Sequence, residues 1–119
     1  MRNQGFTLLE LLVVTGLLSV LLGLAYWHIA PIRQKALLVA GQAYVRSVAT
    51  DLEARRNPST GSLPTQLTDC TQGFGEKPKS VATCTIFYPT STTFIIEASL
   101  RGAVASRIRY EEGNLVTLP

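Results

Sequence analysis

The sequence contains little of the material from which enzyme active sites are built. Only one of its 119 residues is histidine, and only two are cysteine. His28 lies in an apolar stretch, so a histidine-based triad cannot form in a soluble part, and the sequence shows neither a glycine-rich phosphate loop nor a nucleophile elbow. The only adjacent carboxylates, Glu111-Glu112, lie in a turn-forming segment. We therefore predict that the protein is not an enzyme and needs no cofactor or metal.

Charged side chains are absent from one long stretch near the N-terminus. From Leu11 to Ile32 there are 22 consecutive residues without Asp, Glu, Lys or Arg. As a helix this stretch would be about 33 Å long, which is enough to cross a bilayer. It is apolar on all sides, so no single stripe would face a soluble core. We expect a membrane helix, or a helix buried among copies of itself.

Glu10 is the one charged residue at the start of this apolar segment. A carboxylate in such surroundings is costly unless it is protonated or paired, and the only base nearby in the chain is Arg2. A cut between Gly5 and Phe6 would create an α-ammonium four residues before Glu10. Within one helix this amine and the carboxylate could meet at helical spacing. Between two staggered copies, the amine of one could neutralise the carboxylate of the next.

The N-terminus resembles the class III signal of type IV pilins and pseudopilins. The features are a short polar leader with one positive charge, Met1-Arg2-Asn3-Gln4-Gly5, followed by Phe6-Thr7-Leu8-Leu9-Glu10-Leu11-Leu12-Val13-Val14. The motif covers residues 1 to about 30. An ordinary secretory signal or single-span anchor is the alternative. Glu10 is wrong for the apolar region of a secretory signal, and residues 26–31 offer a poor cleavage site, so the pilin-like interpretation is favoured.

This resemblance implies a processing and assembly route. Residues 1–5 would be a leader removed after Gly5 by a prepilin peptidase, and the new amine of Phe6 would be methylated. The helix of residues 6–32 would hold the prepilin in the bacterial inner membrane as a single span and later form the fibre core. Glu10 would set the register of assembly through the Phe6 amine. The implied partners are copies of the chain in a helical fibre, the assembly platform and minor pilins.

Residues 33–119 are predicted to form a periplasmic or extracellular head with an α+β fold. Its first part, residues 33–55, has the pattern of an amphipathic helix. The residues at spacings of three and four that predict its buried face are Leu38, Gly41, Val45, Val48 and Leu52. Pro58 ends this helix because a proline disfavours helical geometry in the residue before it.

Residues 56–83 are predicted to be a long loop. It is longer than most loops inside a domain, which suggests a functional or covalently closed segment. A disulfide between Cys70 and Cys84 would close it, as two cysteines in a small exported domain favour. Metal ligation by these cysteines is a poor alternative because a second pair of ligands is missing.

Residues 84–118 are predicted to form an antiparallel sheet of three to four strands. One strand begins at Thr85, and residues 92–100 and 103–110 alternate between apolar and other side chains. Arg101-Gly102 and residues 111–114 are predicted turns. A meander of this kind would cover the amphipathic helix with its apolar face, giving a pilin fold of one long helix packed on a small sheet.

Three arginines of the predicted sheet, Arg101, Arg107 and Arg109, suggest a second activity. Cations on one face can contact phosphates and give sequence-independent affinity for DNA. The alternative is a solvated outer face balanced by Glu97 and Glu111, or a contact between subunits. We favour this alternative, and keep DNA as a possible partner.

The function that this sequence predicts is that of a structural subunit of a type IV pilus. Roles implied by the family are twitching motility, adhesion and DNA uptake. The alternatives are a minor pilin or a pseudopilin of a type II secretion or competence system, and a DNA-binding module displayed on such a fibre. The presence of Glu10 favours a subunit of the fibre body, because a member that caps the tip often lacks this glutamate.

Overall fold

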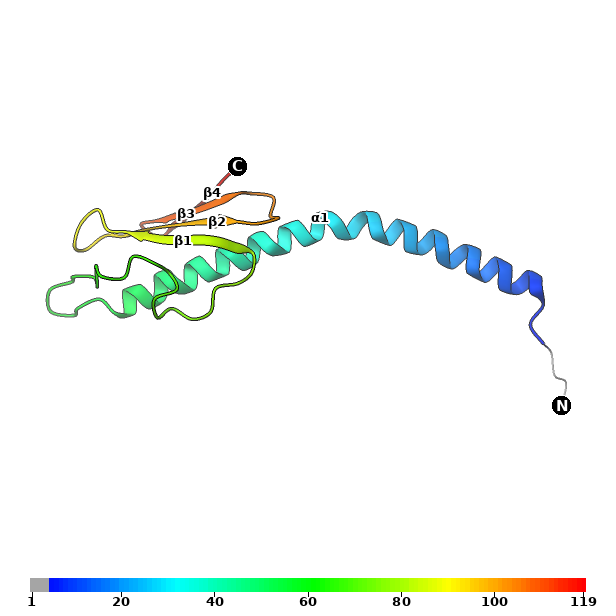
Figure 1. Cartoon of the computed structure of the whole chain (residues 1–119), viewed down its shortest axis with the longest axis horizontal. Helices are drawn as coiled ribbons and strands as arrows, with labels where there is room; N and C mark the ends of the chain where they lie inside the picture. The colour runs from blue at the N-terminus through cyan, green and yellow to red at the C-terminus, as the bar shows by residue number, and fades with distance from the viewer. Residues whose placement is uncertain (1–4) are drawn as a thin grey trace. The chain divides into compact units, whose positions relative to one another are not determined.

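A computed structural model describes residues 5–119 of the chain, which form one long helix followed by four strands (Figure 1). The chain divides into two compact units, the first ending at Ile32 and the second comprising Arg33–Pro119. Helix α1, Leu8–Ala54, is continuous through both. The two units are described separately below, and residues 33–119 are called the head.

The first unit exposes almost nothing but apolar side chains. Its large hydrophobic residues are between 44% and 88% exposed, with Val14 the least and Leu8 the most exposed. By length and composition α1 could cross a membrane, although a signal sequence near the N-terminus passes the same test. In water so much exposed apolar surface is unfavourable, so this unit needs lipid or other protein around it.

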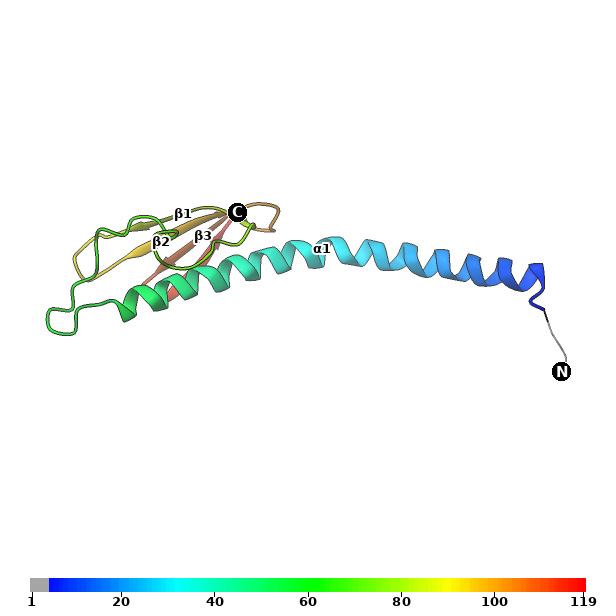
Figure 2. The ribbon, with the colours of Figure 1, turned by 60° about the horizontal axis from the view of Figure 1, so that its bottom comes forward.

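In the head, α1 buries one face against the sheet (Figure 2). The buried residues of the helix are Gly41, Tyr44, Val45, Val48, Ala49 and Leu52. They recur at the three- and four-residue spacing of one helical face, which is why four of the five residues predicted to form this face are fully buried. The fifth, Leu38, is half-buried and packs against the core.

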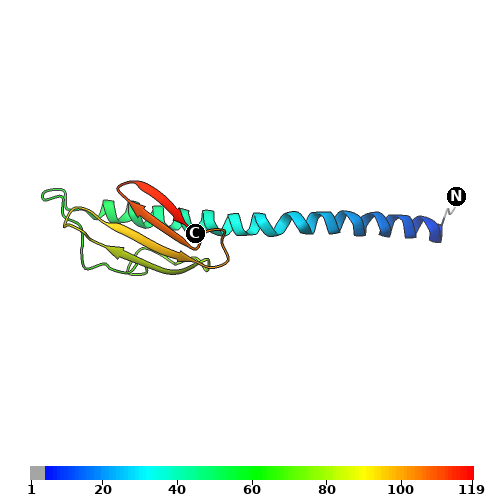
Figure 3. The ribbon, with the colours of Figure 1, turned by 90° about the horizontal axis from the view of Figure 1, so that it is seen from above.

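The sheet is an antiparallel meander in the order β1-β2-β3-β4 (Figure 3). Its strands are β1 Val81–Phe87, β2 Ile95–Leu100, β3 Arg107–Glu111 and β4 Asn114–Leu118. Alternation buries Phe94, Ile96, Ala98 and Leu100 toward the helix, together with Ile86 and Ile108. The predicted α+β architecture, with one long helix packed on a small antiparallel sheet, is confirmed.

The turn between β3 and β4 determines the register of the last hairpin. Glu111 pairs with Asn114, so only Glu112 and Gly113 form the loop. Both have positive φ, 48° and 85°, as a type I′ turn requires. The twist of such a turn matches that of the flanking strands, and β4 therefore continues the meander directly from β3.

The structure places three boundaries of the sheet differently from the sequence prediction. The strand predicted from residue 92 begins at Ile95. The sheet begins at Val81, not at residue 84, because a register shift between Val81 and Thr83 interrupts the simple alternation. The strand predicted from residue 103 begins only at Arg107. Residues 101–106 form a loop, which the hydrogen bond from Leu100 N to Ser106 O closes at 2.8 Å.

The predicted leader lies almost wholly outside the described residues, since only Gly5 of residues 1–5 is described. Gly5 and Phe6 are exposed and precede the helix, which begins at Leu8. The peptide bond proposed for cleavage is therefore in irregular backbone, two residues before the first helical turn.

Candidate functional site

The start of α1 brings together the residues predicted to control assembly. Thr7 caps the helix: Glu10 N donates to Thr7 Oγ1 at 3.3 Å and to Thr7 O at 3.1 Å. Leu11 N donates to the same carbonyl at 3.2 Å. Glu10 is thus the third residue of the helix, where a carboxylate interacts favourably with the positive end of the helix dipole.

Sequence reasoning missed Thr7, although a signal for it exists. Thr7-Leu8-Leu9-Glu10 has the spacing of a capping box, in which Ser or Thr is followed three residues later by Glu. This local role and a role between subunits are compatible, because capping uses the backbone amide of Glu10 and leaves its exposed carboxylate available. Phe6, four residues earlier in the chain, is 74% exposed, so the Glu10 carboxylate and the Phe6 side chain are both accessible to whatever surrounds this end of the helix.

In the head, the two cysteines form a disulfide with a Cα–Cα distance of 5.5 Å. The short segment before Cys70 lies along the outer edge of β1, where Ile86 N donates to Thr68 O at 2.8 Å and Cys70 N donates to Cys84 O at 3.4 Å. The buried hydroxyl of Tyr44 donates to Cys70 O at 3.1 Å. The disulfide therefore ties the loop to the sheet, the Tyr44 hydrogen bond ties it to α1, and the segment before Cys70 covers one of the two sheet edges.

The pKa values around the disulfide follow from these contacts. Burial, and secondarily the charge of Asp69, raises the pKa of the Tyr44 hydroxyl. Hydrogen bonds from the backbone and side chain of Thr71, at 2.8 and 2.7 Å, lower the pKa of the Asp69 carboxyl. Tyr44 thus stays protonated as a donor, and Asp69 stays ionised as the acceptor that shapes the start of the disulfide loop.

Two adjacent arginines follow the end of α1 and hold different loops. Arg55 donates to Gly73 O at 2.6 Å, pairs with Asp51 at 3.2 Å and lies 4.8 Å over the ring of Phe74. A cation above an aromatic ring is attracted to the negative face of the ring. Arg55 therefore fixes the disulfide loop against the end of the helix.

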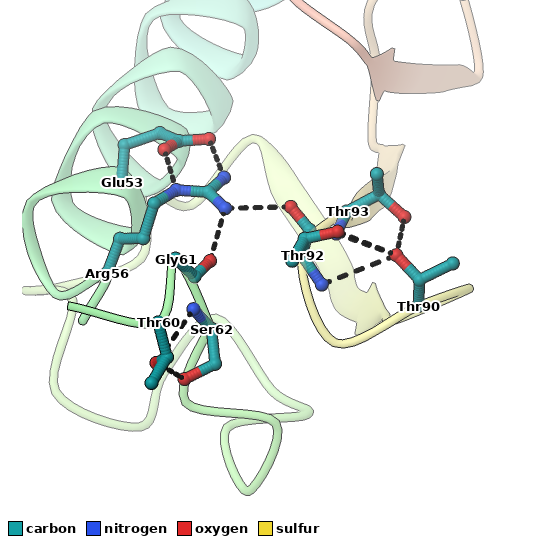
Figure 4. Close-up of polar contacts among 8 residues, drawn as sticks. All are labelled: Glu53, Arg56, Thr60, Gly61, Ser62, Thr90, Thr92 and Thr93. Atoms are coloured by element: carbon teal, nitrogen blue, oxygen red, sulfur yellow. Dashed lines mark hydrogen bonds and ion pairs between the residues drawn. The ribbon is translucent and has the colours of Figure 1, made fainter. Parts of the chain in front are cut away.

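Arg56 joins three segments at the far end of the head (Figure 4). Its guanidinium donates to Gly61 O at 2.7 Å and to Thr92 O at 2.9 Å. It also makes a two-pronged contact with Glu53, at 2.7 and 2.8 Å. The hydrogen bonds from Arg56 to Glu53, and secondarily the charge of Arg56, lower the pKa of the Glu53 carboxyl. The loop after the helix and the β1–β2 loop are thereby fixed to the last turn of α1.

The three arginines considered for DNA contact do not form one set. Arg107 and Arg109 lie on the outer face of β3, whereas Arg101 is in the loop before that strand. Arg109 pairs with Glu97 at 3.8 Å and Glu111 at 3.2 Å, so its charge is balanced. Within the described part of the chain, Arg101 and Arg107 have no ion-pair partner. The geometry thus favours the balanced outer face for Arg109 and leaves the other two exposed.

Comparison with known proteins gives a consistent result. Residues 1–26 match the family model of the prokaryotic N-terminal methylation motif, and residues 38–106 match that of Pilin A4. A type IV-like competence pilin from Thermus thermophilus is 55% identical, with a TM-score of 0.67, over 69% of this chain and 98% of that chain. A type IV pilin protein from the same organism is 34% identical, with a TM-score of 0.65 and the same coverage. Comparison with curated proteins gives no match.

Proposed function

The chain belongs to the Pilin A4 family of type IV pilins, and from this we propose that it is stored in the inner membrane as a prepilin and assembled into an extracellular pilus. The structural observation that carries this proposal is that one chain contains two units of opposite character. The first unit is a fully exposed apolar helix with one carboxylate, and the head has its own core and disulfide. The apolar helix is stable in a bilayer or a fibre core, and the head is stable in water.

Assembly moves the apolar helix from one apolar environment to another. Lipid tails are as apolar as the side chains of a helical core, so the hydrophobic effect alone gives little preference for the fibre. Close packing and the pairing of charges must supply that preference. Gly16 and Gly23 have open space where a side chain would stand, and they permit close approach of a neighbouring helix. Glu10 supplies the only charge between Leu8 and Ile32.

The proposed processing site is the Gly5–Phe6 bond. Gly5 has no side chain, and apart from its chain neighbours no atom of the described residues lies within 4 Å of the position where a Cβ would be. A peptidase can therefore reach the backbone, and removal of residues 1–5 would expose the Phe6 amine for methylation. Replacing Gly5 with Leu should leave the leader attached. Intact-mass analysis of the membrane fraction tests this, and efficient removal of the leader from Gly5→Leu would refute the assignment.

For the role of the pilus we propose DNA uptake, because the relative at 55% identity is described as a competence pilin. Twitching and adhesion are the other roles implied by the family. Deletion of the chain should reduce transformation by added DNA, and normal transformation in the deletion strain would exclude this role. The abundance of the chain in purified fibres separates a major pilin from the second candidate, a minor pilin or pseudopilin of a competence system.

A further inference from the structure

Five exposed cations gather at the end of the head that follows the apolar helix. They are Arg33, Lys35, Lys79, Arg101 and Arg107, here called the basal patch. Arg33 and Lys35 are on α1 directly after Ile32, where the head begins. The other three come from segments distant in the sequence, which the fold brings to the same end.

Backbone contacts place these distant segments together. Arg101 N donates to Ser80 O at 2.7 Å, which sets Lys79 beside Arg101. Arg107 is paired with Ser99 across the sheet, one residue from the end of β2. A Cβ on Gly102 would lie 3.4 Å from the side chain of Leu37, and one on Gly41 would lie 2.5 Å from that of Leu100. The end of β2 and the start of β3 thus lie beside the first turns of the part of α1 that belongs to the head.

Within the part of the chain that the structure describes, the cations of the basal patch form no direct ion pair. Carboxylates do lie near them: Glu76 is three residues before Lys79, and Glu97 lines one surface hollow together with Arg107. Among the described residues, the ion pairs of the head use Arg55, Arg56 and Arg109, none of which belongs to the patch. The five cations of the patch are therefore exposed and free of direct ion pairs within residues 5–119.

We propose that the basal patch binds the head groups of anionic phospholipids in the membrane where the chain is stored before assembly. This inference depends on the proposed function, because it requires the apolar helix to span a bilayer. Tyr26 and Trp27, which are 77% and 84% exposed, have the character of residues at the bilayer interface. Arg33 follows Trp27 by six residues of helix, a rise of about 9 Å, so it lies at or just beyond the head groups.

Two physical arguments favour lipid as the partner. Cations are less common on the translocated side of a span than on the cytoplasmic side, so Arg33 and Lys35 directly after this span are unusual. Anionic head groups would attract them and would strengthen surface binding by about fivefold for each Lys or Arg that reaches them. DNA is the other polyanion that such a patch could bind. The bilayer is favoured because Arg33 and Lys35 are joined to the span by less than one helical turn.

The test uses the full-length chain in nanodiscs made either of phosphatidylcholine alone or of phosphatidylcholine with an equal part of phosphatidylglycerol. Amide hydrogen exchange of the loops at 77–80 and 101–106 should be at least about fivefold slower with phosphatidylglycerol, and high salt should abolish the difference. Equal exchange in both lipids would overturn the proposal. Protection by added duplex DNA in phosphatidylcholine nanodiscs, without protection by phosphatidylglycerol, would reassign the patch to DNA.

Two triple variants with the same change in net charge test whether the basal patch causes the slower exchange. The triple substitution Lys79→Gln, Arg101→Gln and Arg107→Gln should lose the protection. The triple substitution Ser59→Glu, Thr65→Glu and Gln66→Glu changes the net charge equally at exposed positions elsewhere, and it should retain the protection. The wild-type comparison between lipids needs no variant, so it stands even if a triple variant folds poorly. If residues 11–25 are not protected in either nanodisc, the chain does not span, and the proposed function fails instead.

Discussion

Glu53 on the last turn of α1 forms a two-pronged ion pair with Arg56, two residues past the end of the helix, and the same guanidinium donates to the carbonyls of Gly61 and Thr92. The pair orients the guanidinium, and the two carbonyls attach their loops to it. Glu53 thus positions the Arg56 guanidinium for its hydrogen bonds to Gly61 and Thr92, although Glu53 itself makes neither of these bonds. Its substitution should affect loops that lie 8 and 39 residues further along the chain.

The first prediction concerns this pair. Arg56→Ala should lower the thermal midpoint by a few degrees and accelerate hydrogen exchange in both loops, because their carbonyls lose a charged donor. Glu53→Gln should have a smaller effect, since exposed ion pairs contribute little. The matched control is Arg46→Ala, which removes an exposed arginine of α1 that forms no ion pair among the described residues.

The pair also predicts a dependence on pH. The pKa of Glu53 is lowered in the folded state, so its contribution is complete above the ordinary carboxyl pKa and is lost as pH falls through the lowered value. Wild type should therefore lose more stability than Glu53→Gln between about pH 5 and pH 3. Parallel stability curves for the two proteins over this range would show that Glu53 does not contribute in this way.

The second prediction concerns the disulfide. Cys70→Ser with Cys84→Ser should lower the free energy of unfolding by about 2–4 kcal/mol, since the bond closes a loop of a size for which this is typical. Residues 68–74 should exchange faster, while β2 and β3 keep their protection. Non-reducing peptide mapping of native fibres provides the independent check: two free thiols there would contradict the bonded state seen in the structure.

A third prediction concerns Gly41 on the buried face of α1. A Cβ there would lie 2.5 Å from Leu100 Cδ2 and 3.3 Å from Ile108 Cδ1. Gly41→Val should therefore separate the helix from β2 and β3 and cost about 1–3 kcal/mol by overpacking. Ala43→Val, at an exposed position of the same helix, is the control. Equal stability of the two variants would mean that helix and sheet adjust more easily than the contacts imply.

The fourth prediction concerns DNA and the outer face of the sheet. Because Arg109 is balanced by Glu97 and Glu111, Arg109→Ala should leave DNA uptake unchanged wherever the number of fibres is unchanged. The double variant with Arg107→Ala should behave in the same way if this face serves only structure or subunit contacts. Loss of DNA binding at a normal number of fibres would instead assign the face to DNA.

The elements that the sequence predicts well are those in which one local period determines burial. The face of α1 from Gly41 to Leu52 follows the helical spacing, and the apolar side of β2 follows strict alternation. The two-residue turn at Glu112-Gly113 also has a clear local signal. In each case the residues that decide the conformation are neighbours in the sequence, so no knowledge of distant contacts is needed.

The parts that were missed depend on distant contacts or on backbone atoms. Val104 and Ser106 continue the alternation of β3 by residue type. They nevertheless lie in a loop, which a backbone hydrogen bond from Leu100 N to Ser106 O closes. The acceptors of Arg55 and Arg56 are carbonyls, and a carbonyl has no side-chain signature in a sequence. The basal patch is likewise assembled from three segments, and only the fold shows that they share one end.

The last prediction concerns Glu10, for which the structure gives a local role and the proposed function gives a role between subunits. The local role is helix capping, and it needs only the backbone amide of Glu10, which donates a hydrogen bond to Thr7 Oγ1. Substitution of the Glu10 side chain should therefore leave the start of the helix intact. Thr7→Val should remove the cap and fray the first turn without removing the carboxylate, so it serves as the matched control.

The role between subunits needs the charge. Glu10→Ala and Glu10→Gln should still insert into the membrane and lose the leader, and the head from Arg33 should fold as before. Both variants should enter fibres poorly, because the Phe6 ammonium of a neighbouring subunit then has no carboxylate to neutralise it in a medium of low dielectric constant. Glu10→Gln is the sharper test, since it keeps the shape and hydrogen bonding of the side chain. Fibres of normal number and symmetry made from Glu10→Gln subunits alone would show that charge pairing does not determine the register.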